Sequence, residues 1–367
     1  MKILHILSTP RAEGTPNLVL DWLATGLHEQ EVFVLNSEPA DLSERLRAAA
    51  GWYGEADYFG HGKRKFTDIA AGVRRVCRER RPDLVLCWPT GFANWVCLGA
   101  RLAEVKNLLV HCGNPPNRSF KGDWMSRYGL WPLTLLGAKC ICCSAYVRKQ
   151  YQDIPGISPD LLSTVWNCAR ATEVGRRADE VRLERRECGK FVAIMVATLE
   201  GHKDHTTLLH AVALIRGELP QLRLRLAGAG SMAKELQELA DKLRISDIVE
   251  FLGMRRDVPE LLGQADLFVF VTTTQEGLGS VLLEAMAAGL PIVASDVPAC
   301  RELLCEGKYG KLVPPADPAT LAAALVNATR GEVDTFDRHA ARAFAESFTA
   351  KRMIRDYLEI AMPSKSQ

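Results

Sequence analysis

The feature that most limits how this chain can fold is the regular alternation of short apolar runs with longer amphipathic stretches. The runs are continuously apolar, which is typical of parallel strands that helices cover on both faces. The amphipathic stretches, such as 15–28, 68–80 and 204–216, have helical spacing. We therefore expect an α/β protein with doubly wound parallel sheets. The predicted strands are 2–7, 31–35, 83–88, 107–112, 139–143, 163–166, 191–196, 222–226, 248–251, 267–271, 291–294 and 311–313.

The alternation is interrupted once, and the interruption divides the chain. With 367 residues the chain is too long for one ordinary core. Residues 169–190 are rich in charge and contain no apolar run, so we interpret them as a linker or surface crossing. The prediction is a first domain at 1–168, a linker at 169–190, a second domain at 191–346, and a final helical segment at 347–367.

Composition excludes several classes of protein. The net charge of +2 gives no field that would attract nucleic acid, and no run reaches the roughly 18–20 apolar residues of a membrane-spanning helix. The 11 cysteines are scattered, as expected for free thiols in a reducing cytoplasm. The cluster Cys140-Ile141-Cys142-Cys143 lacks the paired spacing of a zinc site, so we interpret it as a buried strand. We predict no metal and no cofactor.

The most informative segment joins a predicted strand to a helix through the turn and helix TTTQEGLGSVLLEAMAAGLP, residues 272–291. Gly277 and Gly279 allow backbone N–H groups to approach a ligand closely, and Ser280 stands where a helix N-cap is expected. Free amides at a helix start suit a diphosphate. Glu276 in the turn and Glu284 on the helix place two carboxylates where they can reach hydroxyls at the two ends of a sugar nucleotide.

This Glu-x7-Glu pair, within EGLGSVLLEAMAAGLPIVASD, closely resembles the motif of retaining glycosyltransferase family 4, whose members have the GT-B fold. The resemblance covers most of the chain and is densest at 191–304. It implies two Rossmann-like domains that face each other across a cleft. The acceptor would lie with the N-terminal domain and a nucleotide-sugar donor with the C-terminal domain, and the last helix would cross back to the first domain.

Other segments follow the family's order, and the resemblance assigns roles to them. Lys203, in VATLEGHKDH, matches a lysine that holds the donor diphosphate, and His111 matches a histidine near the transferred sugar. With Glu276, these are the implied catalytic residues. The implied donor-binding residues are Thr198, Gly228, Gly230, Arg255, Gly277, Leu278, Gly279, Ser280 and Glu284, and the acceptor-side residues are Gly14 and Thr15.

The resemblance also implies a mechanism without a protein nucleophile or a metal. The diphosphate leaves against the charge of Lys203, the acceptor hydroxyl attacks from the same face, and the departing phosphate takes its proton. The chain contains no Asp-x-Asp pair, which holds the metal in the other major glycosyltransferase fold. The donor is expected to be a UDP-sugar, with GDP-sugar as the second choice, and the acceptor a glycan, a lipid-linked sugar or a small molecule.

Two departures from the family's pattern keep other functions open. Thr198 stands where the family has an arginine, and a threonine does not replace the bidentate phosphate contact of a guanidinium. The first loop has one glycine, Gly14, where the family has two. The alternatives are a sugar-nucleotide epimerase of the same fold and a non-catalytic protein that binds sugar nucleotides.

Basic residues gather in the N-terminal half. They occupy 61–65 and the helical stretch with Arg74, Arg75, Arg78, Arg80 and Arg81, while 118–131 interleaves aromatic with basic side chains. This composition suits an anionic membrane surface, although a charged helix face is also commonly just solvated. The hypothesis is a cytoplasmic enzyme with peripheral contact at the inner face of a membrane.

Overall fold

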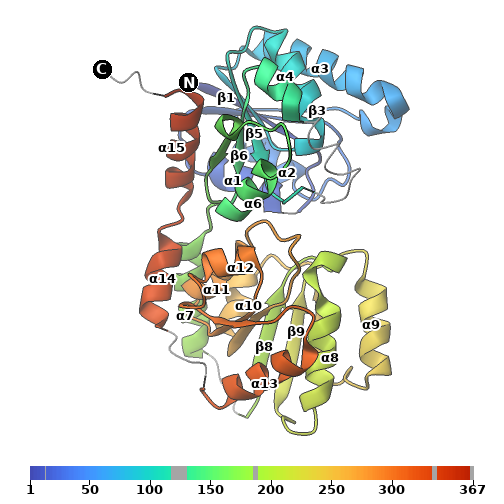
Figure 1. The fold of residues 1–367 in the computed structure, drawn as a ribbon, viewed down its shortest axis with the longest axis vertical. Helices are drawn as coiled ribbons and strands as arrows, with labels where there is room; N and C mark the ends of the chain where they lie inside the picture. Colours follow the sequence, from blue (N-terminus) through green and yellow to red (C-terminus); the bar gives the residue numbers. More distant parts are fainter. Residues whose placement is uncertain (13, 117–129, 185–188, 333–336, 364–367) are drawn as a thin grey trace. The chain divides into compact units, whose positions relative to one another are not determined.

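The computed structural model describes residues 1–12, 14–116, 130–184, 189–332 and 337–363, and the chain folds into two compact units (Figure 1). Unit 1 consists of Met1–Cys168 together with Ala350–Gln367, and unit 2 is Ala169–Thr349. Each unit contains its own parallel sheet with helices around it, which confirms the predicted fold class of doubly wound α/β domains.

The sheet of unit 1 has seven parallel strands in the order β3-β2-β1-β4-β5-β6-β7. Their bounds are β1 Lys2–Leu7, β2 Glu29–Val34, β3 Trp52–Glu55, β4 Leu84–Cys87, β5 Asn107–Cys112, β6 Lys139–Cys142 and β7 Leu162–Thr164. The described helices are α1 Gly14–Leu23, α2 Ser43–Ala49, α3 Lys65–Arg80, α4 Ala93–Arg101, α6 Ala145–Gln152 and α15 Ala350–Ala361, with short 3-10 turns η1 Phe59–Arg64, η2 Thr90–Phe92 and η3 Pro159–Leu161. Helix α1 packs with α2 and α15, and α3 packs with α4.

The sheet of unit 2 has six parallel strands in the order β10-β9-β8-β11-β12-β13. Their bounds are β8 Phe191–Val196, β9 Leu222–Ala227, β10 Val249–Gly253, β11 Leu267–Phe270, β12 Ile292–Ser295 and β13 Lys311–Val313. The described helices are α7 Ala171–Glu184, α8 His205–Ile215, α9 Ala233–Lys242, α10 Val258–Gly263, α11 Val281–Ala287, α12 Pro298–Leu303, α13 Pro318–Thr329 and α14 Arg338–Glu346, with a 3-10 turn η4 Gly201–Lys203.

The prediction of a linker at 169–190 is wrong. Residues 171–184 form α7, which packs against α10 and α11 inside unit 2. Its buried face consists of small residues, Ala171, Val174, Gly175 and Ala178. A side chain at Gly175 would lie 2.8 Å from the carbonyl oxygen of Ala287, so the absence of a Cβ allows this helix to lie close to α11.

The last helix, α15, belongs to unit 1 although it follows the whole of unit 2 in sequence. Met353, Ile354 and Tyr357 are buried on one face of it and join the core around β1, β4 and β5. Side chains at positions i, i+1 and i+4 lie on one side of a helix, so this spacing makes α15 amphipathic. The Tyr357 hydroxyl lies 2.8 Å from Nδ1 of His111, which ties the helix to the end of β5.

Only some of the basic residues in the N-terminal half are exposed to solvent. Arg74, Arg75 and Arg78 are exposed on α3, and Arg81 is exposed directly after its end. Arg80 is half-buried and instead donates to the carboxylate of Glu31, which is fully buried on β2. The aromatic and basic segment 118–131 lies outside the described residues except for its last two positions.

Candidate functional site

Each sheet reverses its strand order once, and several of the predicted site residues lie near these two points. In unit 1 the order reverses between β1 and β4, and in unit 2 between β8 and β11. Loops after such strands leave in opposite directions, so the carboxyl ends of the two strands form a natural binding crevice. Lys203 follows β8 and Glu276 follows β11, while Thr15 and His111 lie near the ends of β1 and β5. We therefore describe one candidate site in each unit.

The centre of the unit 2 site is an ion pair between Lys203 and Glu276. The two side chains are only 14% and 9% exposed, so this pair is largely removed from water. The ammonium of Lys203 also lies 5.0 Å from the centre of the Phe270 ring. The loop that carries Lys203 is held in place because the carbonyl oxygen of His202 accepts from the Thr272 hydroxyl at 2.9 Å and from the Thr273 amide at 3.0 Å.

Glu276 is held as a carboxylate by its surroundings. Burial alone would raise its pKa, but the ammonium of Lys203 outweighs burial, helped by His202 and a backbone hydrogen bond from Leu278, and keeps the pKa below its ordinary value. Its Oε1 atom accepts from the amide of Gly279 at 3.1 Å. The turn amide of Gly279 thus has a partner within the chain, a carboxylate that takes the place predicted for a ligand.

The turn itself differs in detail from the prediction. Gly277, Leu278 and Gly279 are buried, and Gly279 has φ = +74°, which explains the need for glycine there. Ser280 is the residue before α11, but its side chain makes no capping hydrogen bond, so the predicted N-cap interaction is wrong. The carboxylate of Glu276 satisfies turn amides in its stead.

The two glycines after β9 serve close packing between loops. A Cβ on Gly228 would lie 1.8 Å from the carbonyl oxygen of Ala197, and one on Gly230 would lie 2.4 Å from that of Leu199. These contacts place the loop after β9 directly against the loop that contains Thr198, which is half-buried. The glycines therefore shape the floor of the site through the backbone.

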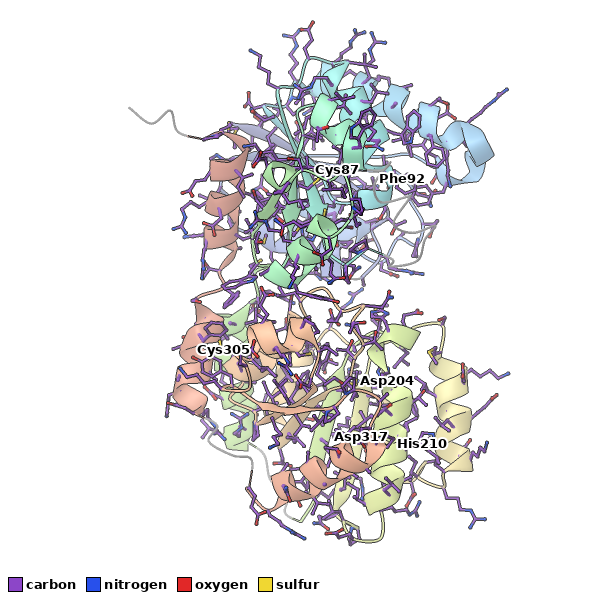
Figure 2. The ribbon with its side chains drawn as sticks, viewed as in Figure 1. Cys87, Phe92, Asp204, His210, Cys305 and Asp317 are labelled. Atoms are coloured by element: carbon purple, nitrogen blue, oxygen red, sulfur yellow. The ribbon has the colours of Figure 1, made fainter. Side chains whose placement is uncertain are left out.

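The remaining predicted donor residues lie in neighbouring loops or on α11. Arg255 follows β10 and is exposed, with its guanidinium paired to Asp257 through a 2.7 Å hydrogen bond from Nε. Glu284 lies in the first turn of α11 and is half-buried. His205, the first residue of α8, is buried with no partner at either ring nitrogen among the described residues. Burial lowers its pKa to about 4, so the ring is neutral at pH 7. Figure 2 labels its neighbour Asp204, whose carboxylate caps α8 by accepting from the Thr207 amide.

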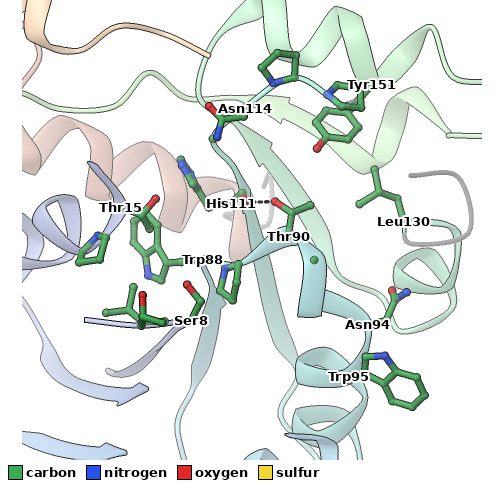
Figure 3. A pocket seen from close by; sticks show the side chains of 18 residues that line it. Ser8, Thr15, Trp88, Thr90, Asn94, Trp95, His111, Asn114, Leu130 and Tyr151 are labelled. Carbon is green, nitrogen blue, oxygen red and sulfur yellow. Dashed lines mark hydrogen bonds between the residues drawn. The ribbon is translucent and has the colours of Figure 1, made fainter. Parts of the chain in front are cut away.

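The site in unit 1 is a cavity of about 520 Å³ at the carboxyl ends of β1, β4 and β5. His111 forms part of its wall, and Figure 3 shows Thr90 donating to the His111 carbonyl, over a distance of 3.0 Å. Thr15, at the start of α1, also lines it. Gly14, predicted with it, is exposed and is not among the lining residues.

His111 is a neutral imidazole in this structure. It is buried, and burial lowers its pKa to about 4. Its Nδ1 atom lies 2.8 Å from the Tyr357 hydroxyl, and its ring lies 4.9 Å from that of Trp88. The indole N–H of Trp88 in turn donates to Nδ1 of His5 at 3.2 Å. A neutral histidine suits hydrogen bonding to an uncharged ligand group.

Several cavity residues were missed by sequence reasoning. Trp88, Thr90, Asn94 and Trp95 come from the segment CWPTGFANW after β4, and Tyr151 comes from α6. The available signal was the change from an apolar strand to a segment of Pro, Thr, Asn and Trp. Such strand-end segments form the crevice of a doubly wound sheet.

Neither a metal cluster nor a membrane span is found in the part of the chain that the structure describes. Its His, Cys, Asp and Glu residues form no group of three that could hold a metal ion. Cys140 and Cys142 are buried within β6, as the strand interpretation predicted. The helices among the described residues are all too short or too polar to cross a bilayer.

Comparisons with known proteins agree with this arrangement. Residues 178–343 match the family model of glycosyl transferases group 1. The putative glycosyltransferase EpsD of Bacillus subtilis is 39% identical over 36% of this chain, but the alignment spans only 34% of that relative. A Campylobacter jejuni protein, N-acetylgalactosamine-N,N'-diacetylbacillosaminyl-diphospho-undecaprenol 4-alpha-N-acetylgalactosaminyltransferase, is 25% identical over 68% of this chain and 67% of its own length.

The fold comparison covers nearly the whole molecule. The crystal structure of HepE from Anabaena, solved in complex with UDP and glucose, superposes with a TM-score of 0.84 over 98% of both chains at 20% identity. The matched segment 178–343 contains both Lys203 and Glu276 and nearly all of unit 2. Residues 178–343 therefore resemble the glycosyl transferases group 1 family, and the chain has the GT-B fold.

Proposed function

We propose that this protein is a retaining glycosyltransferase that moves a sugar from a UDP-sugar, bound by unit 2, to a glycan or lipid-linked acceptor, bound by unit 1. The observation that carries the proposal is the buried pair of Lys203 and Glu276 at the strand-order reversal of unit 2, inside the group 1 segment. UDP is favoured as the nucleotide because HepE was solved with UDP and glucose. A lipid-linked acceptor is supported by the name of the Campylobacter relative.

Lys203 would act on the leaving group. When a donor binds, its diphosphate competes with Glu276 for the ammonium, and the buried position strengthens that contact. As the bond between the sugar and the diphosphate breaks, Lys203 stabilises the charge that develops on the phosphate. The acceptor hydroxyl attacks from the face that the diphosphate leaves and passes its proton to the departing phosphate. Glu276, released from Lys203, is free to bind sugar hydroxyls.

His111 would take part as a neutral group. Its low pKa removes it as a cation near pH 7, so it can donate to or accept from a sugar hydroxyl without attracting phosphate. Thr198 lacks the charge of the arginine it replaces, and Arg255 is paired with Asp257. Lys203 is thus the principal cation proposed for the diphosphate, with neither metal nor cofactor needed.

The decisive test is release of UDP from a panel of UDP-sugars and GDP-sugars with acceptor glycans. We expect acceptor-dependent release that falls by about 100-fold or more in Lys203→Ala. The chain offers Lys242 at the end of α9 as a control, since Lys242→Ala removes a lysine of the same unit far from the loops after β8 and β11. Acceptor-independent release with sugar isomerisation would show an epimerase, and binding without turnover a non-catalytic protein.

We further propose that the enzyme works in the cytoplasm with peripheral contact to an anionic membrane. All ten cysteines of the described residues are free thiols, as expected in a reducing compartment. The positive face consists of four exposed arginines, Arg74, Arg75 and Arg78 on α3 and Arg81 directly after its end. Sedimentation with vesicles containing phosphatidylglycerol at low salt should be lost when these four arginines are changed to glutamine. Equal sedimentation of the variant would refute the contact.

A further inference from the structure

We infer that the acceptor is an uncharged oligosaccharide of at least two sugars, with its terminal sugar in the unit 1 cavity and the preceding sugar stacked on an aromatic platform beside the cavity. The platform is the set of rings of Phe59, Phe66, Phe92 and Trp95. This inference rests on the proposed function. It names the class of acceptor and the number of acceptor sugars that the enzyme contacts.

The cavity lining has the chemistry that recognises a neutral sugar. None of its described residues is Asp, Glu, Lys or Arg, and its one histidine is neutral. Hydroxyl and amide groups come from Thr15, Thr90 and Asn94, and ring surfaces from Trp95 and Tyr151 (Figure 3). Hydroxyls and amides can both donate and accept, which matches sugar hydroxyls. A phosphate or carboxylate would instead need a cation, and the described residues of the lining include no Lys or Arg.

The aromatic platform begins at the cavity wall and leads away from it. Trp95 lines the cavity, and its ring stacks on Phe66 with 5.7 Å between centres. Phe66 lies 6.3 Å from Phe92, and Phe92 stacks on Phe59 at 5.0 Å. All four residues are half-buried, so none of them is sealed inside the core. The platform is therefore continuous with the cavity through one shared residue.

The surroundings of the platform favour a sugar chain over a lipid tail. The ammonium of Lys65 lies 5.2 Å from the centre of the Phe66 ring and 5.9 Å from that of Phe92, and the adjoining residues His61 and Arg64 are exposed. Such a surface of separate rings among charged groups suits the apolar faces of sugar rings, which carry hydroxyls at their edges. Binding of an acyl chain would require a larger continuous apolar patch.

A position in a reaction sequence follows from this geometry. If the preceding sugar contributes to recognition, the enzyme acts poorly on a first sugar attached directly to a phosphate. Another glycosyltransferase must then supply an acceptor that already has two neutral sugars, and this protein extends it.

The test is binding of neutral glycans to the full-length protein, measured by saturation-transfer NMR and calorimetry without donor. The probes are methyl glycosides and tetrasaccharides ending in glucose, galactose, mannose or N-acetylglucosamine, together with sugar 1-phosphates. The variants are Phe66→Ala and Phe92→Ala, because neither residue lines the cavity. Trp52→Ala is the matched control, since Trp52 is a half-buried ring of unit 1 that stacks on Phe33 on the other side of the sheet's reversal point.

We expect at least one neutral tetrasaccharide to bind about tenfold more tightly than its terminal methyl glycoside. Phe66→Ala and Phe92→Ala should remove that difference and leave methyl glycoside binding unchanged, while Trp52→Ala changes neither. The inference is overturned if only sugar 1-phosphates bind, if affinity is independent of chain length, if no neutral glycan binds, or if the two platform variants instead lose binding to lipid vesicles. UDP-glucose titration in the same samples is a separate readout, so loss of donor binding would contradict the proposed function and not the acceptor class.

Discussion

Removing the ammonium of Lys203 should destabilise unit 2 and leave unit 1 intact. Lys203→Met keeps an unbranched stem near Phe270 and deletes only the charge. It leaves the carboxylate of Glu276, 9% exposed, without its cation. Breaking one side of a buried ion pair costs about 3–5 kcal/mol. Because Glu276 keeps the Gly279 amide as a partner, we expect the lower end, about 3 kcal/mol.

The distribution of tryptophan allows the two units to be followed separately. All seven tryptophans of the chain lie in its first 168 residues, so tryptophan fluorescence reports on unit 1 alone. Amide hydrogen exchange in β8 and β11 reports on unit 2. The expected result is faster exchange in these two strands of Lys203→Met, with an unchanged fluorescence transition in urea. The double variant Lys203→Met/Glu276→Gln should recover about 2 kcal/mol, because it leaves no unpaired charge.

The effect of pH on the stability of Lys203→Met provides a second test of this prediction. In the wild type the folded-state pKa of Glu276 lies below its ordinary value, so its stabilising effect is full at neutral pH and is lost as pH falls through the folded-state pKa. In Lys203→Met, burial acts without the opposing ammonium and raises that pKa. The deficit of the variant should therefore be largest at pH 7 and shrink as pH falls toward the ordinary carboxyl pKa of 4.5. A deficit that does not change with pH, or no deficit at pH 7, would refute the reasoning.

Three further outcomes are expected. Gly228→Ala should lower the free energy of unfolding by about 3 kcal/mol or more by circular dichroism, because its Cβ would lie 1.8 Å from the Ala197 carbonyl oxygen, whereas Gly217→Ala, with open space around it, should not. Tyr357→Phe should cost about 1 kcal/mol in urea titrations followed by tryptophan fluorescence, since it removes the hydrogen bond to His111. The free energy of unfolding of unit 1 should fall as the pH drops from 6.5 to about 4, because His111 takes up a proton in the unfolded state but stays neutral in the folded state. In His111→Gln this fall should be smaller by up to about 3 kcal/mol.

The strands that the sequence predicted well are those buried on both faces. The predicted strands agree with the observed ones to within two residues at each end, because a continuous apolar run reports burial directly. The strand β3, Trp52–Glu55, was missed because it lies at the sheet edge, is at most half-buried and contains a glycine, so no apolar run marks it. Helix α7 was missed because its buried face is made of alanine, valine and glycine among many charges. The buried residues have helical spacing, but small side chains produce only a weak amphipathic pattern in the sequence.

The sequence singled out individual candidate residues of the site but not their arrangement. Lys203 and Glu276 were both identified, yet their contact joins residues 73 positions apart and depends on β8 and β11 being neighbours in the sheet. The platform of Phe59, Phe66 and Phe92 comes from η1, α3 and η2, and no local pattern connects these elements. Contacts of this kind follow from strand order, which the alternation of strands and helices leaves open.

The two units differ in what lies at the point where the strand order reverses, and this difference bears on how a donor would bind. In unit 1 the crevice is an open cavity of about 520 Å³, and the described residues that line it include no Asp, Glu, Lys or Arg. In unit 2 the charged groups at the reversal are already paired with each other, and Glu276 also accepts from the turn amide of Gly279. A ligand that contacts Lys203 must replace a buried carboxylate with an anion of its own, since any weaker partner would leave Glu276 and the ammonium uncompensated. A nucleoside without phosphate offers no such anion, so under the proposed function we expect the ion pair to favour the diphosphate of a nucleotide sugar over the bare nucleoside.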